Sequence, residues 1–271
     1  MGDLNGDGIA DVVTGNFLGT VSVLLGNGVG GFGAKTDHPI VTEASSVVLA
    51  DLNGDTFLDL VVGQTDGAGV LSVLFGDGTG DLSAPTDVAI GVFASVQVAD
   101  MDGDTIPDLV AARLYYDEVS VLLGDGLGGF GSPTNFATGD YPTALAVADV
   151  NGDKFPDVAT GNLLADTLSV LLGDGVGGLE AATFFVSGDG PNSVAVADVN
   201  GDARPDLLAA NLDAASVSVL LGDGSGGFGP KTDAATGDRP YAVKVADLNG
   251  DSLPDLVTAH LQSSSVFVLL G

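Results

Sequence analysis

The sequence predicts an all-β fold assembled from repeated four-stranded units, and three observations support this. An acidic nine-residue motif recurs six times at almost constant spacing. Short runs rich in Val and Leu separate the copies, as expected for strands. The 42 glycines among 271 residues favour turns and disfavour long helices.

The acidic motif opens the chain as "DLNGDGIAD" at residues 3–11. Its relatives stand at 51–59, 100–108, 149–157, 198–206 and 247–255. The spacing is therefore 48 residues once and 49 residues four times. Self-similarity at a period near 50 residues is typical of arrays and propellers.

Each repeat unit has the same internal order, which the fifth unit illustrates. Run A, "VAVAD" (194–198), precedes the acidic loop; run B, "DLLAAN" (206–211), follows it; run C is "VSVLLG" (217–222). After a "GDG" hairpin signal, a looser run D ends near "TG" (236–237). We expect strands A to D to form an antiparallel meander, and such units repeated radially make a β-propeller.

The two ends of the chain are incomplete in this scheme. Met1 and Gly2 stand where strand A of the first unit would be, and "VFVLLG" (266–271) ends the last unit before strand D. Units that start near residues 3, 51, 100, 149, 198 and 247 give 22 strands, which predicts one six-bladed domain over 1–271. Five blades, with 242–246 as strand A of the first unit, and seven blades remain open. We also expect that the chain is part of a longer protein or lacks its native N-terminus, because no signal peptide precedes the first loop.

The composition excludes several classes of partner. The net charge is −30, with 37 acidic and 7 basic residues, so nucleic acid and anionic membranes are poor partners. The chain has no Cys, which excludes disulfides and thiolate metal sites. No apolar run approaches the roughly 18 residues of a membrane-spanning helix, so we expect no membrane insertion.

The acidic residues point to a hard cation. The chain has 34 Asp and 3 Glu, and 19 of the Asp residues lie in the six loops. Positions 1, 3 and 5 of each loop carry Asp or Asn, position 7 offers a backbone carbonyl, and position 9 is Asp. Oxygen-only ligands in a flexible loop favour Ca²⁺ over Mg²⁺ and over the softer metals. The predicted ligands are Asp3, Asn5, Asp7, Ile9, Asp11; Asp51, Asn53, Asp55, Phe57, Asp59; Asp100, Asp102, Asp104, Ile106, Asp108; Asp149, Asn151, Asp153, Phe155, Asp157; Asp198, Asn200, Asp202, Arg204, Asp206; Asp247, Asn249, Asp251, Leu253 and Asp255.

Two other interpretations of these loops are less favourable. An EF-hand requires Gly at position 6 and Glu at position 12, and only Gly8 meets the first requirement. Simple turn capping by Asp and Asn does not require so many carboxylates in six loops. Gly at position 4 of every copy permits a sharp bend.

The pattern D-x-[DN]-x-D-x-x-x-D, followed by a strand and later by "GGFG", resembles the FG-GAP or VCBS repeat of integrin α-subunit-like β-propellers. The resemblance covers essentially the whole chain in six copies. It implies a propeller with one calcium ion in each A–B loop, up to six in all.

Other motifs are weaker. "GDGVGGL" (173–179) and its relatives resemble a dinucleotide-binding motif, but they recur between strands, so hairpins are the better interpretation. His38 and His260 lie in different units without a triad pattern, and Asp pairs for glycoside hydrolysis remain a remote alternative. We therefore expect no enzyme activity.

Aromatic and Arg residues gather in the loops that a meander places opposite the acidic loops. Tyr and Arg are favoured at binding hot spots. The candidates in the B–C and D–A loops are Arg113, Tyr115, Tyr116, Tyr141, Arg239 and Tyr241. The alternative for Tyr141 and Tyr241 is packing beside Pro142 and Pro240.

These observations predict a calcium-stabilised binding or adhesion module that recognises a protein or a glycan through the B–C and D–A loops. Because free calcium is abundant outside cells, we expect an extracellular or cell-surface protein. A lectin with repeated carbohydrate sites is one alternative. A structural propeller that self-associates through its incomplete end units is another.

Overall fold

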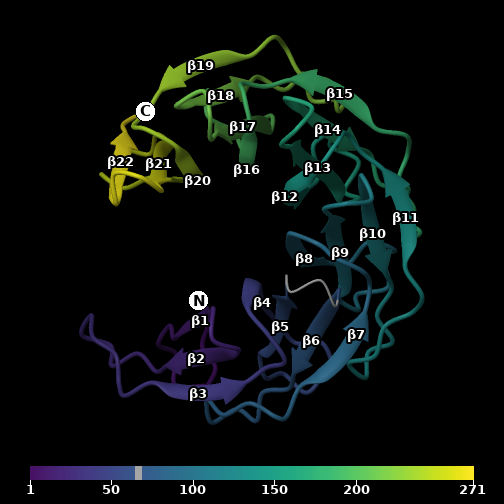
Figure 1. The fold of residues 1–271 in the computed structure, drawn as a ribbon, viewed down its shortest axis with the longest axis vertical. Coiled ribbons are helices and arrows are strands. Elements are labelled where there is room, and N and C mark those ends of the chain that lie inside the picture. The colour runs from purple at the N-terminus through teal and green to yellow at the C-terminus, as the bar shows by residue number, and fades with distance from the viewer. Residues whose placement is uncertain (65–68) are drawn as a thin grey trace. The chain divides into compact units, whose positions relative to one another are not determined.

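The computed structural model describes residues 1–64 and 69–271, and all regular structure in this part of the chain is β. It contains 22 strands in six antiparallel sheets (Figure 1). None of the described residues forms a helix long and apolar enough to cross a membrane.

The first and last sheets have three strands and the other four have four, in meander order. The first sheet consists of β1 (Val12–Asn16), β2 (Thr20–Leu24) and β3 (Thr36–Pro39). The second consists of β4 (Ala44–Ala50), β5 (Asp59–Gln64), β6 (Val70–Leu74) and β7 (Thr86–Ala89). The third consists of β8 (Ser95–Ala99), β9 (Asp108–Arg113), β10 (Glu118–Leu122) and β11 (Thr134–Ala137). The fourth consists of β12 (Pro142–Ala148), β13 (Asp157–Asn162), β14 (Thr167–Leu171) and β15 (Thr183–Val186). The fifth consists of β16 (Pro191–Ala197), β17 (Asp206–Asn211), β18 (Ser216–Leu220) and β19 (Thr232–Ala235). The sixth consists of β20 (Pro240–Ala246), β21 (Asp255–His260) and β22 (Ser265–Leu269).

The predicted assignment of strands A to D to each unit is confirmed, as is the absence of strand A from the first sheet and of strand D from the last. The five-blade alternative is wrong. Its proposed closing strand lies in β20, which pairs with β21 in the register Ala242↔Ala259. The "GDGVGGL" segment is a hairpin between β14 and β15, closed by the Gly173↔Leu179 bridge.

The chain divides into two compact units. One contains Met1–Asp100, Asp104–Tyr115 and Ser120–Thr134; the other contains Met101–Gly103, Tyr116–Val119 and Asn135–Gly271. The single domain over residues 1–271 therefore stays a prediction.

In the first unit, neighbouring sheets bury one apolar layer between them. Val21 and Val23 of β2 pack with Leu60 and Val62 of β5. The other face of the second sheet packs on the third, where Val61 meets Leu109. Strand β5 is buried along its whole length because both of its faces are covered, which explains its continuous apolar run.

The second unit repeats this arrangement. Leu168 and Val170 of β14 pack against Leu207 and Ala209 of β17, and the other face of the fifth sheet packs against Val243 of β20. The first strands of neighbouring sheets contact one another, β12 with β16 and β16 with β20, as Figure 1 shows. The A–B loops consequently lie at one end of every sheet and the B–C loops at the other.

Candidate functional site

Each A–B loop wraps its backbone around the carboxylate at position 1. Asp3 Oδ1 accepts hydrogen bonds from the N–H groups of Gly6 (2.8 Å) and Asp7 (3.2 Å), and Oδ2 accepts one from Gly8 (2.7 Å). The bond from the position-6 N–H to position-1 Oδ2 recurs in all six loops. The loop is therefore built around one carboxylate.

Positions 3 and 5 turn toward the same centre. Asn5 Oδ1 accepts the N–H of Asp7 (3.1 Å), and its Nδ2 donates to Asp7 Oδ2 (3.0 Å). Asp7 Oδ1 accepts the N–H of Ile9 (2.8 Å), a bond that recurs from position 7 to position 5 in all six loops. The alternate spacing therefore brings the side chains of positions 1, 3 and 5 together, as the sequence predicted.

The Asp at position 9 is buried, with at most 1% of its surface exposed in any copy. Asp11 Oδ2 accepts the N–H of Leu4 and Oδ1 accepts the N–H of Gly26, both at 2.8 Å. The first bond closes the A–B loop, and the second reaches the C–D hairpin of the same sheet. The bond from the hairpin Gly recurs in every repeat, at Gly26, Gly76, Gly124, Gly173, Gly222 and Gly271.

This tie between loop and hairpin was not foreseen from the sequence. The only signal for it was the pairing of Asp at position 9 with a Gly 15 to 17 residues later in every copy. The side chain at position 7 also packs against the C–D hairpin. A Cβ added at Gly78 would lie 2.3 Å from the Phe57 ring, so the ring leaves no room for a side chain there. The backbone carbonyl of position 7 stays a predicted ligand.

The loops are also strained at a place that the sequence did not reveal. Position 4 has positive φ, as expected for Gly. Position 6 has positive φ as well, in residues that rarely adopt it, such as Thr56 (φ 76°) and Lys154 (φ 76°). Strain of this kind is concentrated at binding sites.

Hydrogen bonds and burial shift the carboxyl pKa values in opposite directions. Backbone amides hold the pKa of Asp3 and of Asp247 below the ordinary value of 3.8, led by Gly8 and Ser252 respectively. Burial raises the pKa of Asp59 and Asp157, and neighbouring carboxylates of the same loop raise it further. A cation among these groups would relieve that repulsion.

The donor set fits a hard cation. The side chains at positions 1, 3, 5 and 9 end in carboxylate or amide groups, and Asp100, Asp102 and Asp108 offer carboxylate oxygens that lie within 4.8 Å of one another. Such oxygens suit Ca²⁺, and no sulfur or imidazole ligand joins them in the described loops. The residues that would hold the ion are those at positions 1, 3, 5, 7 and 9 of each loop.

The structure places the predicted ligand-face residues at the opposite ends of the sheets. Tyr115 and Tyr116 lie in the B–C loop after β9, with 64% and 51% of their surfaces exposed, and Arg113 is the last residue of β9. Arg113 and Tyr115 belong to the first unit and Tyr116 to the second.

The other three residues all belong to the second unit. Tyr141 has positive φ (61°) and donates its backbone N–H to Asp117 Oδ1 at 2.9 Å. Arg239 pairs with Asp213 at 3.5 Å. Tyr241 was expected in a D–A loop, but it is the second residue of β20, at a bulge between Pro240 and Ala242 that leaves it 53% exposed.

The two histidines are buried, His38 in β3 and His260 in β21. His260 is buried in β21, where Nε2 contacts Thr258 Oγ1 at 2.8 Å and Nδ1 contacts the Asp238 carbonyl at 3.1 Å. Its ring packs on Phe267. These contacts give His260 a structural role.

The six sheets and their repeated loops define a repeat-built β-propeller. The chain belongs to the FG-GAP-like repeat family, whose pattern matches residues 3–62, 51–111, 100–160 and 198–258. Among curated protein sequences, none matches this chain.

Solved structures share the fold at low sequence identity. A lectin of Agrocybe aegerita that recognises non-reducing terminal N-acetylglucosamine aligns with a TM-score of 0.62 at 20% identity, over 100% of this chain and 69% of the lectin. BBS1N, solved in complex with ARL6DN, aligns with a TM-score of 0.70 at 14% identity, over 99% of this chain and 78% of that one. The V. cholerae biofilm matrix protein Bap1 aligns with a TM-score of 0.53 at 21% identity, over 86% of this chain and 38% of Bap1.

Proposed function

We propose that this chain is a calcium-stabilised binding module that works outside the cell and recognises a protein or a glycan through its B–C and D–A loops. The observation that carries the proposal is the exposure of Tyr115, Tyr116 and Tyr241 at the sheet ends opposite the acidic loops. Tyr supplies a large contact area at low entropic cost, which makes it frequent at binding hot spots.

Calcium has a structural role in this proposal. The acidic loops sit at the turns between strands A and B, and position 9 ties each loop to a neighbouring hairpin. An ion bound there stabilises only the folded state, by about 2.7 kcal/mol per site when free calcium is 100 times the dissociation constant. That condition is met more readily outside the cell than in the cytosol, which supports an extracellular location.

The structural relatives support binding as the general activity. One is a lectin, one was solved with a protein partner, and one belongs to a biofilm matrix. Both glycans and proteins are therefore reasonable ligands for this fold. The proposal includes no catalytic step.

The experiment compares the wild type with a Tyr115→Ala/Tyr116→Ala variant on a glycan array and a panel of purified surface proteins. The expected result is loss of the wild type's binding signal with an unchanged melting temperature. Phe184→Ala is the control, because Phe184 is equally exposed but lies on the outer strand β15. Full binding by the double variant would contradict the choice of these loops.

A lectin with several carbohydrate sites is the second candidate. It is supported by the likeness to the N-acetylglucosamine-binding lectin and by the repetition of the sheets. Free monosaccharide would then inhibit binding to a multivalent glycan, whereas a protein-specific module would be unaffected.

A further inference from the structure

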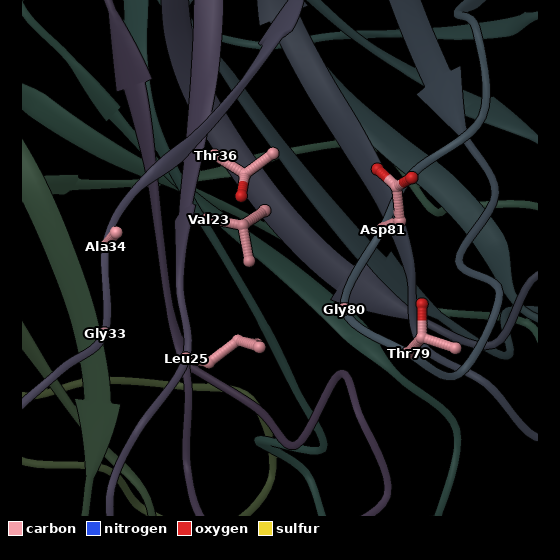
Figure 2. Close-up of a pocket in the computed structure, with 8 residues that line it drawn as sticks. All are labelled: Val23, Leu25, Gly33, Ala34, Thr36, Thr79, Gly80 and Asp81. Carbon is pink, nitrogen blue, oxygen red and sulfur yellow. The ribbon is translucent and has the colours of Figure 1, made fainter.

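A cavity of about 330 Å³ lies in the first unit between the first sheet and the C–D hairpin of the second sheet. This volume is at the small end of the range for ligand pockets. Figure 2 shows its two walls. The lining residues are Val23, Leu25, Gly33, Ala34 and Thr36 on one wall and Thr79, Gly80 and Asp81 on the other.

Asp81 sets the hairpin at this cavity apart from the hairpins of the other repeats. The corresponding position of the other four C–D hairpins is Gly, at Gly31, Gly129, Gly178 and Gly227. The side chain of Asp81 is 68% exposed, so no burial requirement explains the carboxylate. A repeat that departs from its own pattern by adding a charged group at a cavity is a candidate binding position.

A second departure from the repeat lies directly behind the first. His38 of β3 occupies the place of Val88, Phe136, Phe185 and Ala234 in the other outer strands. Its side chain is only 9% exposed, and its Nδ1 lies 3.6 Å from Asp81 Oδ1. A polar ring has thus replaced an apolar side chain where it faces the added carboxylate.

The cavity offers hydrogen-bond acceptors beside an apolar surface. The Asp81 carboxylate accepts only; its Oδ1 already accepts the N–H of Leu82 at 3.0 Å and keeps a second lone pair, and no bond to Oδ2 is seen among the described residues. The Thr79 hydroxyl already donates to Asp77 Oδ1 at 2.7 Å, so it presents its lone pairs to the cavity. Thr36 adds a hydroxyl across the cavity, and Leu25 and Ala34 supply the accessible apolar part. A matching ligand has adjacent O–H donors on one edge and a C–H face.

We propose that this cavity binds one pyranose unit of a glycan. Two vicinal hydroxyls of the sugar donate to the Asp81 carboxylate, a third meets Thr36, and the C–H face of the ring rests on Leu25 and Ala34. This site goes beyond the proposed function, because it lies at the hairpin end of the sheets and uses none of the B–C or D–A loop residues.

The test is saturation-transfer NMR with the whole chain and millimolar methyl glycosides of glucose, galactose, mannose and N-acetylglucosamine. At least one glycoside is expected to receive saturation from the wild type. Asp81→Gly is expected to weaken that glycoside's binding about ten-fold to a hundred-fold, because a charged hydrogen-bond acceptor is lost. The variant restores the residue found in the other four hairpins, so it is expected to fold.

Two further variants complete the test. Thr36→Val removes a hydroxyl at nearly constant volume and is expected to weaken binding several-fold. Glu180→Gln removes one exposed charge from the segment between β14 and β15, outside both the cavity and the B–C and D–A loops, and is expected to leave binding unchanged.

The inference is overturned if no glycoside receives saturation, or if Asp81→Gly and Thr36→Val bind as the wild type does. It is also overturned if only an amine, with spermidine as the probe, binds in an Asp81-dependent way. Loss of array binding in the Tyr115→Ala/Tyr116→Ala variant together with wild-type glycoside binding by Asp81→Gly would support the proposed function and refute this pocket.

Discussion

The backbone N–H of Gly173 donates a hydrogen bond to Asp157 Oδ1 at 2.8 Å, and the same bond links the A–B loop to the C–D hairpin in all six repeats. The other oxygen of Asp157 accepts the N–H of Val150. One short carboxylate thus satisfies two backbone donors that come from different turns. Glu would place its carboxylate one methylene too far, which explains Asp at every position 9.

The substitution Asp157→Asn is expected to destabilise the protein by about 1–3 kcal/mol, because the new NH₂ group faces one of the two backbone donors. Urea unfolding in EDTA measures this effect without the contribution of bound metal. Asp174→Asn is the matched control, since Asp174 Oδ1 accepts the N–H groups of Val176 and Gly178, and Asn27 Oδ1 accepts the same two bonds in the first hairpin. Equal stability of the two variants would show that the second bond contributes little.

Calcium is expected to raise the melting temperature strongly at millimolar concentration, and excess EDTA to reverse the rise. Six divalent ions would offset twelve of the thirty net negative charges, which reduces self-repulsion in the folded state. Magnesium is expected to have a much smaller effect because it retains its hydration water. An identical melting curve in calcium and EDTA would mean that the loops are turns without a metal.

Replacement of Thr56 by Gly is expected to stabilise the metal-free protein by about 1 kcal/mol. Thr56 is β-branched and has φ 76°, which strains its backbone. Gly removes this strain, and the gain is expected to exceed the entropic cost that Gly adds through the unfolded chain. Thermal unfolding in EDTA measures the change. Thr20→Gly, in the regular strand β2, is the control and should destabilise. A loss of stability in Thr56→Gly would show that the backbone at Thr56 is not strained.

The substitution Asp166→Asn is expected to stabilise the protein at neutral pH. The charge of Asp166 is the main cause of the raised pKa of Asp189, with burial and Asp213 adding to it. Asn keeps an oxygen for the N–H of Gly190, which Asp166 Oδ1 accepts at 2.9 Å. The gain should shrink in high salt, because screening weakens the repulsion that the substitution removes. A salt-independent gain would indicate another cause.

The metal-free protein is expected to respond to pH in two opposite ways. The pKa values of Asp3 and Asp247 are lowered, so the stability they contribute is present above 3.8 and is lost as the pH falls through their lowered values. The pKa values of Asp59 and Asp157 are raised, so the stability they contribute is present below 3.8 and is lost as the pH rises through their raised values.

Carboxyl-carbon NMR titration in EDTA would measure these pKa values directly, and urea unfolding across the same pH range would measure the stability. The Asp59→Asn variant should show a weaker fall in stability above pH 3.8. If Asp59 titrated below Asp3, the balance between burial and amide donors described here would be incorrect.

The repeat period, the strand order and the position of the acidic loops were predictable from the sequence. Val-rich runs bounded by Gly and Asp have a local preference for strand structure, and this preference recurs in every repeat. The convergence of Asp3, Asn5 and Asp7 was also predictable, because alternate residues in a tight loop turn toward one side. Six copies of one pattern made each local prediction more secure than a single copy would.

Other features depended on contacts that no local pattern encodes. Tyr241 was expected in a loop, but a bulge extends β20 by pairing Pro240 with His260. The positive φ at Thr56 could not be predicted from the sequence, because Gly, the residue that usually adopts it, occupies position 6 only in the first loop.

The sequence by itself determined the number of repeats, their strands and the oxygen-rich loops, because each of these follows from neighbouring residues within one unit. Only the tertiary structure decided that Asp157 bonds to Gly173 and that Asp81 lies against His38 at a cavity. Those pairs are 16 and 43 residues apart, and the second joins two different sheets. Their contact is set by how whole sheets pack, a property to which every buried side chain contributes.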